Sequence, residues 1–239
     1  MIAILILLFS ASASYPQEKL IVVTDIWPPF SELRDEGLRG KSTKIVKEAL
    51  ALADIPYELW TVPWARAYQM ARTKKNVIIF TIVKTETRKP LFQWVSEIHP
   101  PSSTYLYSYD QRRDNIDTFE KAKETSISST RESMAAQALF IKGHSSAKNM
   151  TLTVDAISAI RMAQLGRTKF VAAAEDTVNY YMKQHPKTRN KFHKGLYLLH
   201  NEYYVAASLQ TSDEIIEKLK SAIRTIAPYT SNHEDKFNN

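Results

Sequence analysis

Short apolar runs alternate with stretches of helical periodicity along this chain, and this alternation constrains its fold more than any other feature. Leu20 to Thr24, Val77 to Val83 and Phe170 to Ala174 contain at most one polar residue each, as is typical of strands buried on both faces of a parallel sheet. Apolar residues recur at helical spacing over 45–53 and again over 64–72. Strands that alternate with helices predict an α/β fold with a largely parallel sheet.

The composition changes in the middle of the chain, where an aromatic and proline-rich passage runs from Phe92 to Tyr109. Beyond it the alternation of helices and strands resumes, which predicts a second α/β lobe. An extended stretch over 196–209 then carries the chain back, and an amphipathic helix over 215–226 follows it. We therefore expect four segments: a signal peptide over 1–13, the first lobe over 14–107, the second lobe over 108–200, and a return to the first lobe over 201–239.

The first residues have the pattern of an export signal. An unbroken apolar run from Ile2 to Phe9 is followed by the small residues Ala11-Ser12-Ala13, so we expect cleavage near Ala13. No later run approaches the roughly 20 apolar residues of a membrane-spanning helix. The chain has no cysteine, which excludes disulfides and thiolate ligands. An exported protein without disulfides is typical of the bacterial periplasm.

The net charge is +7, and much of the excess lies between Lys183 and Lys194, where five Lys or Arg residues and two His residues occur without an acid. Such a run is compatible with an anionic partner. We interpret it as a solvated loop, and we expect no nucleic acid among the partners of this protein.

Two segments could bind an anion. Thr85 and Arg88 follow a predicted buried strand, and a guanidinium there can bind a carboxylate through two parallel hydrogen bonds. Ser129 and Thr130 lie between a short predicted strand and a helix, where free backbone N–H groups and the positive end of the helix favour an anion. Each segment also has an ordinary structural interpretation, because an Arg in a turn is often exposed and because Ser and Thr are common N-caps.

The rest of a ligand could contact aromatic and acidic residues at the ends of predicted strands. Trp27, Phe30 and Trp64 lie where ligands of open α/β sheets bind, and their rings could enclose an apolar or cationic group. Glu175 and Asp176 follow another predicted strand and could accept an ammonium group. The alternatives are that the rings belong to the core and that the acids belong to the first turn of a helix.

Motifs for common catalytic chemistry are missing from the sequence. The six histidines form no i, i+4 pair, and no Gly-rich phosphate loop exists among five glycines. There is likewise no Gly-x-Ser-x-Gly elbow. We therefore expect no metal, no organic cofactor and no enzyme activity, although acid–base catalysis by Asp or Glu requires no fixed spacing.

The order of several motifs along the chain is more informative than any one of them. They are the loop Trp27-Pro28-Pro29-Phe30, the turn Gly37-Leu38-Arg39-Gly40, the segment Pro63-Trp64-Ala65-Arg66-Ala67, the Thr85-x-x-Arg88 step, the run Phe92-Gln93-Trp94-Val95, and the strand Tyr204-Val205-Ala206 with the helix start after Thr211. This order resembles that of the family 3 extracellular solute-binding proteins, the polar amino-acid receptors of ABC importers. The resemblance covers nearly the whole mature chain and is stronger in the first lobe.

The resemblance implies a two-lobed type II periplasmic-binding-protein fold, with two crossover strands and a ligand cleft between the lobes. It also implies that Arg88 binds the carboxylate of the ligand, that Phe30 flanks the ligand, and that Thr130 contributes from the second lobe. Two positions differ from the family. Val83 stands where many amino-acid binders have a hydroxyl, and Ser129 stands where glycine is frequent.

The function that this resemblance implies is that of a periplasmic receptor. It would close on a small polar ligand, an amino acid or similar carboxylate, and present it to a membrane ABC permease. Two alternatives share the scaffold. One is an enzyme similar to cyclohexadienyl or arogenate dehydratases, and the other is a ligand-sensing module that a signalling partner reads.

Overall fold

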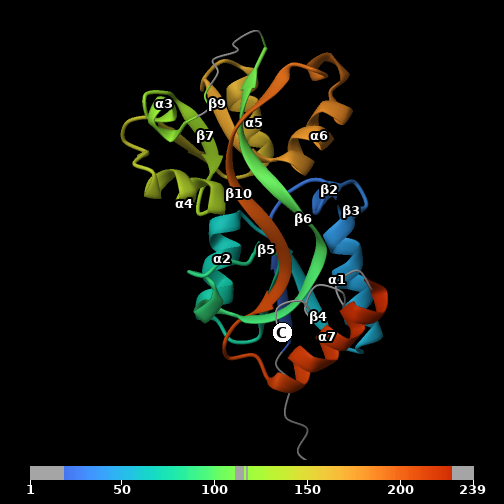
Figure 1. Ribbon diagram of the computed structural model, residues 1–239. Coiled ribbons are helices and arrows are strands. Elements are labelled where there is room, and N and C mark those ends of the chain that lie inside the picture. Colours follow the sequence, from blue (N-terminus) through green and yellow to red (C-terminus); the bar gives the residue numbers. More distant parts are fainter. Residues whose placement is uncertain (1–18, 111–115, 117, 228–239) are drawn as a thin grey trace, which may run out of the picture.

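A computed structural model describes residues 19–110, 116 and 118–227, and the predicted signal peptide over 1–13 lies outside this part of the chain. The chain forms two α/β lobes, and two long strands run through both of them (Figure 1). The first lobe contains β1 (Leu20–Thr24), α1 (Lys41–Leu52), β4 (Tyr57–Thr61), α2 (Trp64–Thr73), β5 (Val77–Val83) and α7 (Asp213–Ile226). The second lobe contains α3 (Phe119–Lys123), β7 (Ile127–Thr130), α4 (Met134–Ile141), β8 (Met150–Thr153), α5 (Ala156–Gln164), β9 (Phe170–Ala174) and α6 (Glu175–Gln184).

The two long strands, β6 (Gln93–Tyr109) and β10 (Phe192–Ala207), are antiparallel to each other and connect the lobes. β10 pairs with β5 of the first lobe, and β6 pairs with β9 of the second lobe. Eight strands therefore form one mixed sheet in the order β4-β1-β5-β10-β6-β9-β7-β8. The predicted α/β fold with two lobes and two crossover strands is confirmed.

The strand β6 includes Pro100 and Pro101, in a passage to which the sequence assigned no strand. Proline cannot donate to a ladder, which argues against a strand at such a place. Here the two prolines lie opposite the segment between Asn201 and Tyr203, where the register of the β10–β6 ladder shifts. The sheet thus passes the prolines at an irregularity, just before β6 begins to pair with β9.

Smaller elements complete the fold. β2 (Glu32–Arg34) and β3 (Gly37–Arg39) form a separate hairpin where the sequence predicts only a turn. Two short 3₁₀ turns, η1 (Lys89–Leu91) and η2 (Pro186–Thr188), follow β5 and α6. Among the described residues, no helix combines the length and the apolarity that a membrane crossing requires.

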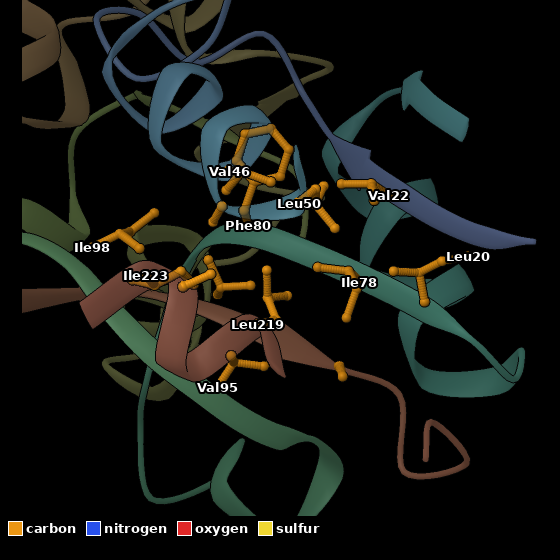
Figure 2. Close-up of a cluster of buried hydrophobic side chains, with 14 of the residues drawn as sticks. Leu20, Val22, Val46, Leu50, Ile78, Phe80, Val95, Ile98, Leu219 and Ile223 are labelled. Carbon is orange, nitrogen blue, oxygen red and sulfur yellow. The ribbon is translucent and has the colours of Figure 1, made fainter. Parts of the chain in front are cut away.

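The largest part of the core lies between the first-lobe sheet and the helices α1 and α7 (Figure 2). Leu20, Ile78 and Phe80 come from the strands, and they share this cluster with Leu50 of α1 and Leu219 of α7. All five side chains are at most 2 % exposed. Burying a side chain of this size contributes about 1.5–3 kcal/mol, so this cluster anchors the C-terminal helix on the first lobe.

The loop after β1 is held against the start of α1. The Lys41 N–H donates to the Pro29 carbonyl at 3.0 Å. Gly40 permits this approach, because a Cβ there would lie 2.3 Å from the Phe30 carbonyl oxygen, and because its φ of 123° suits glycine. The loop that carries Trp27 therefore has a fixed position relative to α1.

We predict that Gly40→Ala lowers the free energy of unfolding by about 2–5 kcal/mol, since it combines backbone strain with a steric clash. Gly37→Ala is the matched control, because Gly37 also has a positive φ, of 99°, but a Cβ there would have no neighbour within 4 Å. Urea unfolding measures both changes. Equal losses in the two variants would show that the close approach at Gly40 is unimportant.

Candidate functional site

A cavity that is open to solvent on one side lies between the two lobes, with a volume of about 60 Å³ for the centres of water-sized spheres. Elements of both lobes reach it near the carboxyl ends of their strands, where open α/β sheets bind ligands. The first lobe contributes Asp25, Trp27, Trp64, Thr81, Val83 and Arg88. The crossover strands contribute Thr104 and Asn201, and the second lobe contributes Thr130, Ser133, Met134, Ala135, Ala156, Ala172, Ala173 and Ala174.

Arg88 is the one cationic residue that lines the cavity in the described part of the chain, and it is only 1 % exposed. Its guanidinium carbon lies 4.9 Å from the ring centroid of Tyr68 and 5.7 Å from that of Trp64. Nη1 donates to the Val83 carbonyl at 3.2 Å, Nη2 donates to the Glu132 carbonyl at 3.0 Å, and Nε has no hydrogen-bond partner. Burial lowers the pKa of Arg88 to about 10, so the group keeps its charge at neutral pH.

Thr85 supports Arg88 through its backbone and lies outside the cavity lining. Its carbonyl accepts hydrogen bonds from the N–H groups of Arg88 at 3.0 Å and Lys89 at 2.8 Å. Its hydroxyl lies 3.2 Å from the hydroxyl of Thr87. The predicted Thr85-x-x-Arg88 step is thus a turn that directs the guanidinium inward.

Asp25 is a cavity residue that the sequence analysis missed. It follows β1 directly and is 5 % exposed, and its Oδ1 atom has no hydrogen-bond partner. Burial raises the pKa of Asp25 to about 7, and the nearby charge of Asp155 adds to the rise. Its position, directly after a buried strand and before two prolines, is the sequence signal that could have identified it.

Thr81 is a second cavity residue that the sequence analysis missed. It lies inside β5 with a φ of 60°, which is a strained conformation for a β-branched residue. Ile82 pairs with Tyr204 and Phe80 with Val205, so Thr81 is the extra residue of a bulge. The Thr81 hydroxyl is buried and has no partner. In the sequence this threonine looks like one more residue of a buried strand.

On the second lobe, Thr130 lines the cavity and Ser129 does not. Ser129 is fully buried, and its hydroxyl lies 3.3 Å from the hydroxyl of Ser133. Ser133 is the N-cap of α4, since its side chain accepts a hydrogen bond from the Ala136 N–H at 3.1 Å. In the polar segment at the end of β7, Ser133 therefore caps α4, and both Thr130 and Ser133 line the cavity.

The remaining predicted residues have different surroundings. Trp27 lines the cavity, whereas Phe30 is 2 % exposed and belongs to the first-lobe core. Glu175 forms an ion pair with Lys194, and Asp176 also lies outside the cavity lining. Both acids occupy the first turn of α6, where negative charge interacts favourably with the helix dipole.

The lobes touch each other through the carbonyl of Glu132, which contacts two residues of the cavity lining. This oxygen accepts from Arg88 Nη2 and from Trp64 Nε1, both at 3.0 Å, so two first-lobe donors meet one second-lobe acceptor. Glu132 has a φ of 58°, a conformation uncommon for residues other than glycine. The turn between β7 and α4 thus presents its backbone to the first lobe.

Two further contacts join the lobes, and one of them involves the β2–β3 hairpin. Trp27 Nε1 donates to the Thr177 hydroxyl at 2.8 Å. The Tyr180 hydroxyl donates to Glu32 Oε2 at 2.5 Å and accepts from Arg34 Nη2 at 3.0 Å. These contacts show that the lobes are in a closed arrangement.

Three buried polar atoms in the cavity lining lack hydrogen-bond partners: Arg88 Nε, Asp25 Oδ1 and Thr81 Oγ1. They are a cationic donor, a carboxyl acceptor and a hydroxyl that can do either. Such a set can bind a small molecule that carries both an anionic and a cationic group. Among the described residues, no group of three or more His, Asp or Glu side chains could hold a metal ion.

Comparison with solved structures identifies the fold. The chain matches a variant of the arginine-binding protein ArgBP from T. maritima with a TM-score of 0.75, at 14% identity over 88% of this chain and 90% of that one. It matches the arginine-, lysine-, histidine-binding protein ArtJ from Geobacillus stearothermophilus with a TM-score of 0.75, at 15% identity over 89% and 90%. A histidine kinase sensor domain similar to periplasmic binding proteins gives 0.77, at 13% identity over 89% and 91%.

No family model and no curated protein sequence matches the chain. The structural likenesses at these low identities establish the fold, which is the two-lobed type II fold of periplasmic binding proteins.

We predict that Asp25→Asn stabilises the ligand-free protein at pH 8 and has much less effect at pH 4. The folded state raises the pKa of Asp25 from 3.8 to about 7, so its contribution to stability is complete below pH 3.8 and is lost as the pH rises through 7. A rise of this size corresponds to roughly 4 kcal/mol at most. Urea unfolding at the two pH values measures the effect.

Asp35→Asn is the control for this comparison, because Asp35 is an exposed residue in the hairpin turn. We expect this variant to have nearly the same stability as the unsubstituted protein at both pH values. A stability gain of Asp25→Asn that did not depend on pH would contradict the prediction.

Proposed function

We propose that this protein is a periplasmic solute-binding protein that closes its two lobes on a small zwitterionic ligand, an amino acid. The observation that carries the proposal is the set of unpartnered polar atoms of Arg88, Asp25 and Thr81 in one interlobe cavity. A buried polar atom without a partner costs about 1–3 kcal/mol, and more when it is charged. A ligand with matching groups would remove these costs.

The chemistry of an α-amino acid fits these groups one by one. Its carboxylate would accept charge-assisted hydrogen bonds from Arg88, with the Thr130 hydroxyl adding a contact from the second lobe. Its ammonium group would donate to Asp25 Oδ1. The hydroxyl of Thr81, a residue that lines the cavity, would bind either group. Trp27 and Trp64 would cover the ligand with their rings.

Closure would follow from contacts that the ligand makes with both lobes at once. Only a ligand that binds the closed form more tightly than the open form can shift the population toward closure. The crossover strands β6 and β10 are the covalent links between the lobes in the described chain, and the irregular ladder at Pro100 and Pro101 is the natural hinge. The contacts at Glu132, Thr177 and Tyr180 would then hold the lobes together.

The structural neighbours support an amino-acid ligand, because ArgBP and ArtJ are binding proteins for arginine, lysine or histidine. The delivery of the solute to a membrane ABC permease rests on the motif order of the sequence and on the predicted export signal. A second candidate is a sensing role, which the match to a histidine kinase sensor domain favours. Co-purification with a permease or with a kinase distinguishes the two roles, and ligand capture is the same in both.

We predict that Arg88→Met abolishes or strongly weakens amino-acid binding. Each charge-assisted hydrogen bond that is lost should weaken binding by about tenfold to a hundredfold. The probe is the amino acid that most raises the melting temperature of refolded, ligand-free protein in a screen of the common twenty, and calorimetry then measures its affinity. Thr130→Val, at a partly exposed position, should weaken binding by about twofold to tenfold.

Arg66→Met is the matched control, because Arg66 is an exposed residue of α2 outside the cavity lining. It should bind the probe as the unsubstituted protein does. Unchanged affinity in both Arg88→Met and Thr130→Val would contradict the proposed site, and the absence of any stabilising amino acid would contradict the proposed function.

We also predict that amino-acid binding releases a proton at pH 6. With a pKa of about 7 in the ligand-free protein, Asp25 is mostly protonated at pH 6, and an ammonium group beside it favours the carboxylate. Calorimetry in two buffers with different ionisation enthalpies should show roughly 0.9 proton released at pH 6 and almost none at pH 8.5. A heat that is independent of the buffer at pH 6 would exclude contact between the ammonium group and Asp25.

A further inference from the structure

We infer that the ligand is an amino acid with a neutral, apolar side chain, a class distinct from the basic amino acids for which ArgBP and ArtJ are named. The inference rests on the proposed function, and it concerns the part of the ligand beyond the carboxylate and the ammonium group. Three features of the cavity support it: the balance of its charges, the hydrogen bonds that its neutral polar groups already make, and the composition of its second-lobe wall.

The charges of the cavity lining match a ligand with one anionic and one cationic group. Among the described residues that line it, Arg88 is the one cation and Asp25 the one carboxyl group. A ligand such as arginine or lysine would bring a second cation. That cation would be buried without a counter-charge, which costs several kcal/mol unless a partner is present.

Three acids lie within two positions of a lining alanine in the sequence; two of them, Asp155 and Glu175, already have partners, and the third, Asp176, lies outside the cavity lining. Asp155, whose charge acts on Asp25, caps α5 with both of its oxygens, which accept from the Ser158 N–H at 2.7 Å and from the Ser158 hydroxyl at 2.8 Å. Glu175 is paired with Lys194. Neither is free to receive a basic side chain without breaking an existing interaction.

Most of the neutral polar groups that line the cavity also have hydrogen-bond partners within the protein. Asn201 and Thr104 hydrogen-bond to each other at 3.0 Å, and the Ser133 hydroxyl caps α4. The indole N–H of Trp27 donates to Thr177, and that of Trp64 donates to a backbone carbonyl. A polar ligand side chain would therefore find few free partners, whereas the indole rings remain available for apolar contact.

The second-lobe wall is mostly apolar. Beside Thr130 and Ser133 it contains Met134 and five alanines, Ala135, Ala156, Ala172, Ala173 and Ala174, and Val83 lies on the first-lobe side. Alanine side chains leave room and carry no polar atom. An aliphatic or aromatic ligand side chain would bury its surface there with a gain of about 25 cal/mol per Å².

The test compares affinities by calorimetry on refolded, ligand-free protein. The apolar probes are valine, leucine, methionine and phenylalanine, and the charged probes are arginine, lysine and glutamate. We expect the best apolar probe to bind at least tenfold more tightly than any charged probe. Tighter binding of arginine or lysine that is lost in Arg88→Met would overturn this inference and leave the proposed function intact. Failure of every probe to bind would overturn this inference, and failure of all twenty common amino acids to bind would overturn the proposed function as well.

A charge introduced at Ala174 gives a second, independent test. Ala174 lines the cavity and is the N-cap residue of α6, a position that Asp and Asn favour, so both substitutions are compatible with the helix. Ala174→Asp should raise the affinity for arginine or lysine relative to leucine by at least tenfold, and the uncharged control Ala174→Asn should not. An unchanged preference in a folded Ala174→Asp protein would show that charge balance does not select the ligand.

Discussion

The burial of Arg88 between the lobes, without an ion pair to any described acid, is the constraint on which the rest of the site depends. A guanidinium taken out of water requires compensation. The protein supplies part of it through the rings of Tyr68 and Trp64 and through the carbonyls of Val83 and Glu132. One nitrogen remains without a partner. A site prepared in this way favours an anionic group, and a carboxylate can accept two parallel hydrogen bonds from a planar guanidinium.

The same guanidinium also links the ligand site to the closed arrangement of the lobes. Arg88 belongs to the first lobe, yet one of its hydrogen bonds reaches the Glu132 carbonyl of the second lobe. The Trp64 indole uses the same carbonyl. Closure therefore completes the surroundings of Arg88, and a carboxylate bound there would hold both lobes through one group. The continuous strands β6 and β10 connect the two halves and would keep them in register during the proposed closure.

Much of the architecture follows from periodicity. Each lobe contains short apolar strands, and the amphipathic helix α7 at the end of the chain packs its apolar residues into the first-lobe core. Arg88, Trp27, Trp64 and Thr130 all line the cavity, because the ends of strands meet at one edge of a sheet. The strand β6 was harder to predict. Its two prolines fit into the sheet only because the register of its ladder with β10 shifts beside them. Periodicity within one segment carries no information about such a partner.

The alternation of strands and helices in two units, and the guanidinium after a buried strand, can be read from the amino-acid sequence. Which side chains share the cavity with that guanidinium depends on how the chain folds. Asp25 became a site residue because it is buried in the lining of the interlobe cavity, and Thr81 because a bulge against β10 brings it into that lining. Trp27 and Thr177, 150 positions apart, meet because the two lobes lie against each other. Local propensity depends on residues that are neighbours in the sequence. Burial and hydrogen bonding depend on contacts, formed only in the folded chain, between residues that are far apart in the sequence.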